Sequence, residues 1–301
     1  MLDRYKSTLK TGEKHLPESF SKKLVAAFST SGQLCVGIDP HEETLIENGF
    51  EVSAQGTLNY GLAMLDELEG AVAIIKPQVS FFERFGSAGF NVLEKLLQEA
   101  NQRGFLVIAD AKRGDIGSTM EAYGQAWLAK SAPFICDALT VNPYLGVGAL
   151  TPAVAFASER GKALFILSAT SNPEGLHLQA STREGKSVAK QVADEVAVLN
   201  TATAATKDKF GNLGLVVGAT VDLGAVGLGD INSERVDLRT PVLAPGFGFQ
   251  GSQLANAKSI FKDIAGDVIY TISRSALRGG IQGVRTSVIE DQAILQTALS
   301  K

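Results

Sequence analysis

The sequence predicts a single (β/α)8 barrel, and three patterns in its 301 residues support this prediction. Short apolar runs recur along the chain, segments of helical periodicity lie between them, and polar residues stand where the runs end. Near-continuous apolar strands separated by helices are typical of a parallel sheet that helices cover, and eight such repeats favour a closed barrel over an open doubly wound sheet. We expect one domain over residues 1–301, with the barrel core at about 33–285.

Helical segments connect the expected strands. Leu62, Leu65 and Leu68 recur at helical spacing before the second apolar run, and a similar spacing follows that run over residues 90–97. No second domain is needed, because α/β barrels of this length fold as one unit. The eight expected strands are residues 33–38, 71–76, 105–110, 138–142, 163–168, 213–219, 242–245 and 268–273.

Composition and charge exclude several classes of protein. Hydrophobic residues make up 45% of the chain and charged residues 20%, which is typical of a globular protein with a large core. The net charge of -4 argues against general nucleic-acid binding, which needs a basic face. No apolar run is long enough to span a membrane, and the charged N-terminus lacks the apolar core of a signal peptide. We expect a cytoplasmic protein without a nucleic-acid partner.

The cysteines and histidines give no sign of metal or covalent chemistry. Cys35 and Cys136 lie beside apolar runs, where a small buried thiol in a reducing compartment is the expectation. His15, His41 and His177 are far apart in the sequence and match no ligand spacing. The sequence also lacks G-x-S-x-G. We therefore expect no metal, no cofactor and no covalent hydrolase chemistry.

The most informative segment of the chain is LVIADAKRGDIGST. Asp110 and Lys112 follow an apolar run, and if the strand continues through Lys112, their side chains share one face about 6.6 Å apart along it. Asp115 lies beyond Gly114, where the chain can turn, so its carboxylate need not join that face within the same subunit. Buried acids and bases are costly unless they are paired, so such a cluster is either a structural ion-pair network or an active site.

Polar residues also stand at the ends of the other expected strands, where (β/α)8 barrels keep their chemistry. A lone lysine commonly extends its side chain to the surface. Lys76, however, stands beside the end of the third expected strand, and this position favours a functional pairing with Asp110. Scattered surface charge would not favour strand ends so consistently. The residues concerned are Asp39, Lys76, Asp110, Lys112, Asn142, Ser168, Ser171, Gln250 and Arg274.

The segment PGFGFQG after the seventh expected strand formally contains G-x-G-x-x-G. It comes too late in the chain to begin a nucleotide-binding βαβαβ half, which argues against the dinucleotide-binding interpretation. A phosphate cradle fits better, because glycines after strands seven and eight let backbone N–H groups approach an anion. Gln250 would add an uncharged donor and Arg274 a bidentate cation. The alternatives are a tight turn without a ligand and a solvated arginine.

Residues 172–190 form an unusually long polar segment between the fifth and sixth strand-helix units. The segment contains Pro173, Gly175, Ser181 and Gly185. We expect a loop insertion here, and a lid and a disordered segment both remain open.

The segment DAKRGDIGST resembles the D-x-K-x-x-D-I-G signature of the orotidine 5'-phosphate decarboxylase family. KPQ after the second strand and APGFGFQG after the seventh are similar to the bacterial type 2 subfamily. The resemblance extends from Asp39 to Arg274, which is nearly the whole chain. It implies conversion of orotidine 5'-monophosphate to UMP and CO2, the last step of de novo pyrimidine nucleotide synthesis, without a cofactor or metal.

The resemblance implies a composite site in a homodimer. Four alternating charges would surround the scissile carboxylate, and Asp115 would be donated by the other subunit. Ile116 and Thr119 would cross the interface with it and contact the substrate. The catalytic residues would be Lys76, Asp110, Lys112 and Asp115.

The resemblance also implies where the rest of the nucleotide binds. Asp39 and Lys76 would hold the ribose hydroxyls, and Ser171 rather than Ser168 would contact the pyrimidine. The phosphate would lie against Gln250 and Arg274. The implied substrate-binding residues are Asp39, Ile116, Thr119, Ser171, Pro245, Gln250 and Arg274.

The chemistry of the implied reaction calls for a lysine. Loss of CO2 from C6 of the pyrimidine leaves a carbanion without an adjacent carbonyl sink. The ammonium of Lys112 would attract that charge as it develops and then donate the proton that ends the reaction. Burial alone can lower the pKa of a lysine by roughly 3 to 5 units, and the carboxylates of Asp110 and Asp115 would oppose that shift.

Two rival functions belong to different classes. A magnesium-dependent sugar-phosphate decarboxylase or synthase of the same barrel group shares the D-x-K-x-x-D segment, but it places a carboxylate at the end of the second strand, where this chain has Lys76. A catalytically inactive nucleotide-binding barrel could act as a sensor. The presence of all four charges argues against that second rival.

Overall fold

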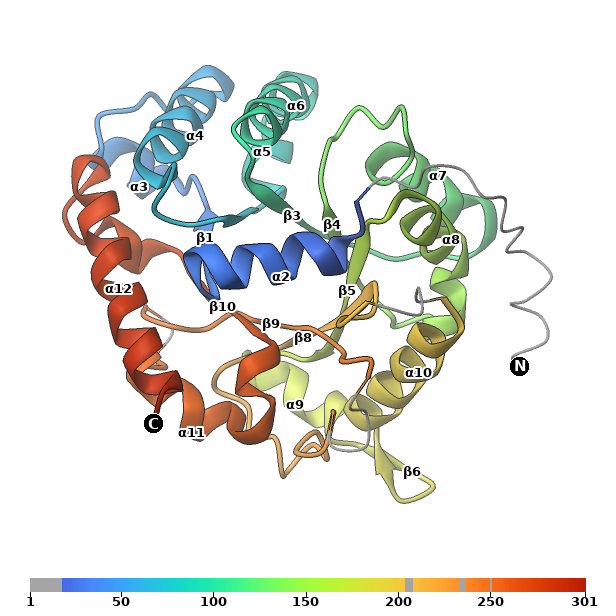
Figure 1. Cartoon of the computed structure of the whole chain (residues 1–301). Coiled ribbons are helices and arrows are strands. Elements are labelled where there is room, and N and C mark those ends of the chain that lie inside the picture. Colours follow the sequence, from blue (N-terminus) through green and yellow to red (C-terminus); the bar gives the residue numbers. More distant parts are fainter. Residues whose placement is uncertain (1–17, 204–207, 233–236, 250) are drawn as a thin grey trace.

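The computed structural model describes residues 18–203, 208–232, 237–249 and 251–301. Within these residues, eight parallel strands form a closed barrel in the order β1-β10-β9-β8-β5-β4-β3-β2 (Figure 1). The expected (β/α)8 barrel is confirmed, and all eight expected apolar runs contribute its strands. These are β1 (Leu34–Ile38), β2 (Ile74–Pro77), β3 (Leu106–Arg113), β4 (Ala138–Val141), β5 (Ala163–Ala169), β8 (Leu213–Val217), β9 (Val242–Ala244) and β10 (Val268–Ile272).

Amphipathic helices cover the outside of the barrel (Figure 1). α4 (Ala54–Leu68) and α6 (Gly86–Gln102) bury the leucines whose spacing predicted them, apart from half-buried Leu62. The two helices pack closely at Gly61, where a Cβ atom would lie 2.8 Å from a methyl group of Leu96, so a larger residue would displace that buried side chain. The other long helices are α7 (Gly117–Trp127), α8 (Thr151–Arg160), α10 (Val188–Thr203) and α12 (Val284–Leu299).

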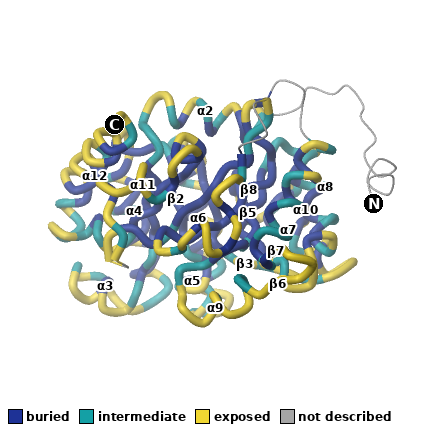
Figure 2. Tube along the Cα trace, turned by 90° about the horizontal axis from the view of Figure 1, so that it is seen from below, coloured by how far each residue is buried: buried dark blue, intermediate teal, exposed yellow. Residues whose placement is uncertain are grey.

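Helix α2 (Phe20–Ser31) closes the amino-terminal end of the barrel. Phe20 and Leu24 are fully buried and join the apolar cluster inside the barrel. The ring of Phe20 meets the ring of Phe165 edge-on, with 5.8 Å between centroids. Figure 2 shows α2 at one end of the molecule and α3 (Glu42–Glu47), α5 (Ser80–Glu83) and α9 (Pro173–Gln179) at the opposite end. The folded unit therefore extends on both sides of the range 33–285 expected for its core.

The barrel interior is a packed core that ends below a polar layer. Cys35, Ile108, Phe165 and Leu243 fill it and are almost completely buried. Cys35 and Cys136 are both free thiols, as the sequence predicted. Burial raises the pKa of each to about 12, so both thiols are protonated at neutral pH.

The chain departs from strand-helix alternation between β8 and β9. The described residues there, 218–232 and 237–241, contain no helix. Leu223, Val226 and Leu228 are buried in place of a helical face.

No helix in the described part of the chain is long and apolar enough to cross a membrane. The short elements are β6 (Thr182–Arg183), β7 (Lys186–Ser187), α11 (Ala257–Phe261), η1 (Val147–Leu150), η2 (Leu254–Asn256), η3 (Lys262–Asp267), η4 (Arg274–Leu277) and η5 (Ile281–Gly283).

Candidate active site

A cavity of about 780 Å³ opens at the carboxyl-terminal end of the barrel strands. Its walls come from the ends of the strands and from the segments that follow them, as expected for this fold. Seven of the eleven residues predicted to be catalytic or substrate-binding line this one cavity. They are Asp39, Lys76, Asp110, Lys112, Ser171, Pro245 and Arg274.

A continuous chain of charges crosses the floor of the cavity. The Lys76 ammonium donates to Oδ2 of Asp110 at 2.9 Å, and the Lys112 ammonium donates to Oδ1 at 2.6 Å. Asp110 also accepts a hydrogen bond from the Thr140 hydroxyl at 2.8 Å. Lys76 and Asp110 are buried, whereas the Lys112 side chain is 44% exposed. The expected pairing of these three charges is therefore present within one chain, with Lys112 nearest to the open cavity.

A local irregularity of β3 brings Lys112 into this chain. The register between β3 and β4 shifts between Ala109 and Arg113, and Lys112 has a left-handed φ of 48°. The backbone N–H of Lys112 donates to the Thr140 hydroxyl at 2.9 Å instead of to a strand carbonyl. At Gly114, a Cβ atom would lie 2.4 Å from the Asn142 carbonyl oxygen, so only glycine allows the chain to turn here. The strand continues beyond the expected range 105–110 and past Lys112, but with a register shift and not as a regular pleat.

The charges on the cavity floor determine one another's protonation. Burial opposes ionisation of Asp110, but the ammonium groups of Lys76 and Lys112 outweigh it and hold the pKa of Asp110 well below its usual value. Burial likewise opposes the charge of Lys76, and the carboxylates of Asp110 and Asp39 outweigh it and raise the pKa of Lys76. Both groups are therefore ionised across the neutral pH range.

Asp110→Asn is expected to lower the free energy of unfolding at pH 7 by about 3 to 5 kcal/mol. The substitution leaves the ammonium of Lys76, which is only 5% exposed, without its countercharge. Urea-induced unfolding measures the change. Asp66→Asn is the matched control, because Asp66 pairs with Arg103 in an exposed ion pair and should cost less than about 1 kcal/mol. Equal stability of Asp110→Asn and the unsubstituted protein would contradict the buried-pair interpretation.

The pH dependence of that stability difference has a defined sign. The folded-state pKa of Asp110 is lowered, so its contribution to stability is present above the unfolded carboxyl pKa of about 3.9 and is lost as the pH falls toward the lowered value. The folded-state pKa of Lys76 is raised, so its contribution is complete below the unfolded lysine pKa of about 10.4 and is lost at higher pH. The deficit of Asp110→Asn should therefore shrink below about pH 4.

A carboxylate and an arginine line the cavity just after β1 and β10. Asp39 follows β1 and accepts a hydrogen bond from the Ser273 hydroxyl at 2.5 Å. Its other oxygen, Oδ1, is buried and has no hydrogen-bond partner among the described residues. The guanidinium of Arg274 lies 3.5 Å from the ring centroid of exposed Phe249. An unsatisfied carboxylate oxygen indicates room for a hydroxyl donor, and the exposed guanidinium can receive an anion.

The described residues of the segment PGFGFQG, 245–249 and 251, lie beside Arg274, whose guanidinium packs on Phe249. Gly246 and Gly248 both have positive φ, of 113° and 77°. A Cβ atom at Gly248 would lie 2.3 Å from the Ser275 hydroxyl of η4. Glycine at this position therefore allows the turn to lie close against η4. Gln250 lies outside the described residues.

Two serines at the end of β5, Ser168 within the strand and Ser171 after it, differ in their environment. The Ser168 hydroxyl donates to the Ala189 carbonyl at 2.9 Å and is thereby used to hold α10. Ser171 lines the cavity further out, and its backbone packs on Gly218, where a Cβ atom would lie 2.7 Å from the Ser171 nitrogen. Both serines line the cavity.

The loop insertion expected at 172–190 contains a short helix and a two-stranded hairpin in the structure. α9 begins at Pro173, which is a favoured residue for the first helical turn, and the hairpin of β6 and β7 turns at Glu184 and Gly185, both with positive φ. Val188, assigned to the loop, is the first residue of α10. Gly175, Leu178 and Gln179 of α9 line the cavity, so the insertion forms part of its wall.

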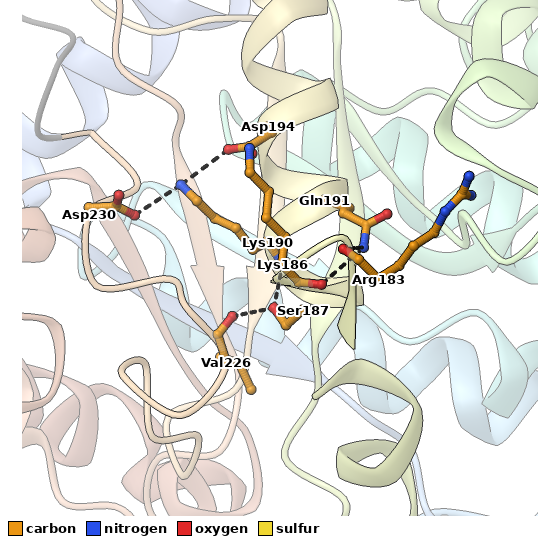
Figure 3. Close-up of polar contacts among 8 residues, drawn as sticks. All are labelled: Arg183, Lys186, Ser187, Lys190, Gln191, Asp194, Val226 and Asp230. Atoms are coloured by element: carbon orange, nitrogen blue, oxygen red, sulfur yellow. Dashed lines mark hydrogen bonds and ion pairs between the residues drawn. The ribbon is translucent and has the colours of Figure 1, made fainter. Parts of the chain in front are cut away.

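Polar contacts fasten the hairpin to its surroundings (Figure 3). The Lys190 ammonium lies 3.0 Å from Asp230 and 3.1 Å from Asp194, and Lys186 donates to Asp194 at 2.6 Å. The Ser187 hydroxyl donates to the carbonyl of Val226 at 2.6 Å. These contacts join the insertion to the irregular segment that replaces the helix after β8.

Three of the expected site residues lie away from the cavity of the single chain. Asp115 accepts a hydrogen bond from the backbone N–H of Ile116 at 2.8 Å, on the turn between β3 and α7. The Ile116 side chain is 61% exposed, and Thr119 is exposed on the first turns of α7. None of the three lines the cavity. The separation of Asp115 from Asp110 and Lys112 agrees with the expectation that Gly114 turns the chain away.

Sequence reasoning did not identify Thr140, Ser273 and His41 as site residues. Thr140 precedes Asn142 by two residues, so strand alternation places both side chains on the same face. This pattern in the sequence could have identified Thr140 as a site residue. Ser273 was included in the last expected strand but was not given a role beside Asp39. His41 follows Asp39 by two residues and lines the cavity, although it was considered only as a metal ligand. The described residues contain no group of three or more His, Cys, Asp or Glu side chains placed to hold a metal ion.

The barrel carries a lysine-aspartate-lysine chain and an exposed arginine at the carboxyl ends of its strands. These features define a (β/α)8 enzyme that acts on an anionic substrate. Comparison with known proteins defines the family. The chain belongs to the orotidine 5'-phosphate decarboxylase / HUMPS family, whose sequence pattern matches residues 32–277.

Individual relatives agree over nearly the full chain. Orotidine 5'-phosphate decarboxylase of Corynebacterium glutamicum is 42% identical over 91% of this chain and 97% of its own length. The enzyme of Streptomyces coelicolor is 42% identical over 94% and 99%. A crystal structure from Streptomyces avermitilis, assigned to the same enzyme, is 41% identical and superimposes with a TM-score of 0.87 over 97% of this chain and all of that one. The Leishmania donovani OMP decarboxylase structure is 26% identical, with a TM-score of 0.74 over 94% and 99%.

Proposed function

We propose that this protein removes CO2 from orotidine 5'-monophosphate to give UMP, as the last step of de novo pyrimidine nucleotide synthesis, and that the Lys76-Asp110-Lys112 chain carries the reaction. Family membership and the names of the 42% identical relatives support this activity. The observation that carries the proposal is the placement of Asp110 between two lysines at the mouth of the barrel.

Each charge has a separate task in this mechanism. The bond between C6 and the carboxylate breaks, and the electron pair stays on C6. The Lys112 ammonium stabilises this pair as it forms and then donates a proton to C6, which leaves a neutral amine that solvent reprotonates. Asp110 holds the Lys112 ammonium in place at 2.6 Å, and Lys76 fixes Asp110 from its other oxygen. A fixed charge costs no reorganisation during the reaction, which is why this arrangement accelerates it.

The remaining cavity residues bind the nucleotide in this proposal. The unpartnered oxygen of Asp39 accepts from a ribose hydroxyl, next to Lys76. Ser171 contacts the pyrimidine, and Pro245, Gln250 and Arg274 hold the phosphate end. The phosphate lies far from C6, so its binding energy serves to orient the ring.

The proposal includes a homodimer in which each site is shared. Asp115 lies outside the cavity of its own chain, and Ile116 and Thr119 beside it are exposed. In the assembled dimer, Asp115 of one subunit completes the charges around Lys112 of the other. We place the enzyme in the cytoplasm, where its two free thiols stay reduced.

The direct test of the activity is an assay of the purified protein with orotidine 5'-monophosphate in the presence of EDTA. Loss of the ultraviolet absorbance of orotidylate, with formation of UMP, is the expected result. Abolition of the activity by EDTA, with recovery on addition of Mg²⁺, would favour the magnesium-dependent decarboxylases or synthases of the same barrel group. Tight UMP binding without any turnover would favour a nucleotide sensor.

Arg274→Ala is expected to raise the KM about 10- to 100-fold, because hydrogen bonds from a cation to an anion contribute about 1.5 to 3 kcal/mol. The Arg274 guanidinium is exposed at the cavity and able to grip a phosphate with two donors. Steady-state kinetics measure the change. Arg274→Lys is the matched control, since it keeps the charge but loses the planar pair of donors, and its KM should fall in between. An unchanged KM for Arg274→Ala would reject this place for the phosphate.

A further inference from the structure

His41 lines the same cavity as Asp39 and Arg274, the groups that hold the sugar and the phosphate in the proposed function. It follows β1, two residues after Asp39, and it lines the cavity. β1 pairs with β10, and the register that joins Val36 to Ile272 brings the ends of these strands side by side. The segment carrying His41 therefore leaves the barrel next to the segment carrying Arg274.

The imidazole of His41 is held in a fixed position. Its ring packs on the ring of Phe81 of α5, with 4.1 Å between centroids. The backbone of the turn is fixed as well, because the His41 N–H donates to the Asp39 carbonyl at 2.8 Å and Arg84 donates to the Pro40 carbonyl at 3.2 Å. A side chain that is half-buried and clamped in this way is preorganised for a ligand.

The local structure gives the imidazole no other task. His41 occupies the N-cap position of α3, but its side chain makes no capping hydrogen bond. Aspartate, serine and asparagine are the usual residues at such a position, so helix formation does not explain a histidine here. The ring nitrogens are therefore not used by the helix that follows.

We infer that His41 binds the 5'-phosphate of the nucleotide together with Arg274 and gains a proton when the phosphate enters the cavity. This inference rests on the proposed function. A neutral imidazole offers one N–H donor to a phosphate oxygen, whereas the imidazolium adds a positive charge as well. The phosphate subsite would thus contain one permanent cation, Arg274, and one that forms only when the ligand is present.

The charges around His41 support this coupling. Burial lowers the pKa of His41 below its usual value, so the imidazole is neutral in the empty site near pH 7. A dianionic phosphate adds negative charge beside it and raises that pKa. The groups that face the ring are the carboxylates of Asp39 and Glu43 and the guanidiniums of Arg274 and Arg84.

The sign of the pH effect follows from these charges. In the inferred complex, the pKa of His41 is higher than in the empty site. The UMP affinity that protonation of His41 adds is therefore fully present below the pKa of the empty site. It is lost as the pH rises through the pKa of the complex. The phosphate of UMP itself titrates near pH 6, and this titration affects both proteins equally. The ratio of the UMP affinities of the variant and the unsubstituted protein therefore reports on the histidine alone.

The test compares UMP and uridine binding to the unsubstituted full-length protein, to His41→Asn and to His177→Asn. Asparagine keeps a neutral donor and caps helices well, so His41→Asn should fold. His177 lies exposed on α9, away from the cavity lining, and serves as the control. We expect His41→Asn to weaken UMP binding about tenfold at pH 6, the scale of a hydrogen bond to a charged group, and about twofold or less at pH 8.5. Uridine affinity should change less than about twofold at either pH.

A spectroscopic measurement accompanies the affinities. The sequence contains three histidines, so the imidazole NMR signals of His41 are identified by their loss in His41→Asn. Titration should give a higher pKa for His41 with saturating UMP than with saturating uridine. An unchanged pKa together with a flat affinity ratio would overturn the inference, and equal losses for UMP and uridine would place His41 at the ribose instead. Failure of the unsubstituted protein to bind UMP at all would count against the proposed function itself.

Discussion

Lys112→Ala is expected to fold normally and to lose decarboxylase activity by at least about 10⁴-fold. The lysine has two tasks in the proposed mechanism, and each is large: a preorganised electrostatic contact contributes about 10² to 10³ in rate, and general acid catalysis about 10² to 10⁴. The fold should survive, because Asp110 keeps its contacts with Lys76 and Thr140. The measurement is kcat with orotidine 5'-monophosphate, combined with urea unfolding of the same preparation.

Two controls separate catalysis from folding and binding in that experiment. Lys95→Ala removes an exposed lysine from α6 and should leave kcat unchanged. UMP affinity of Lys112→Ala should remain within about tenfold, because the interaction that is lost forms mainly as charge develops on C6. A kcat near that of the unsubstituted protein would rule out Lys112 as the acid.

The barrel was predictable because each strand is a short apolar run buried on both faces, while the covering helices carry a regular apolar stripe. The chain of charges at the cavity floor was also predictable, because Lys76 and Asp110 stand at the ends of apolar runs, where an unpaired charge is too costly. Alternation along β3 also placed Asp110 and Lys112 together. The bulge that brings them within 2.6 Å of each other depends on Thr140 of β4, and a pairing between strands is not visible in a single segment.

Features that depend on tertiary packing were not predictable. The sequence of α2 has an apolar stripe, but nothing local says that Phe20 fills the end of the barrel. The turn-rich residues of the insertion indicated a loop, yet α9 forms there, since Pro173 suits a first helical turn. Lys186 and Ser187 fasten the hairpin beyond it to Asp194 and Val226. In the described residues after β8, turns with buried apolar side chains stand where a helix was expected.

Asp115→Ala and Lys76→Ala are each expected to lose most activity as separate proteins, for different reasons. Lys76→Ala removes the partner that fixes Asp110 within the same chain. Asp115→Ala removes a carboxylate that lies outside its own cavity and, in the proposed dimer, faces the lysine of the other subunit. Exposed Glu121 of α7 gives the matched control, Glu121→Ala, which should retain full activity. Full activity of Asp115→Ala would remove this residue from the catalytic set.

The most direct test of the shared site is to mix the two inactive proteins, Lys76→Ala and Asp115→Ala, under conditions that exchange subunits. Each hybrid dimer contains one site with both defects and one site that is intact. Random exchange should therefore restore about one quarter of the activity of the unsubstituted protein, as expected for a two-fold symmetric dimer. Hybrids isolated through different affinity tags and found to be inactive would contradict a site built from Lys76, Asp110 and Lys112 of one subunit and Asp115 of the other.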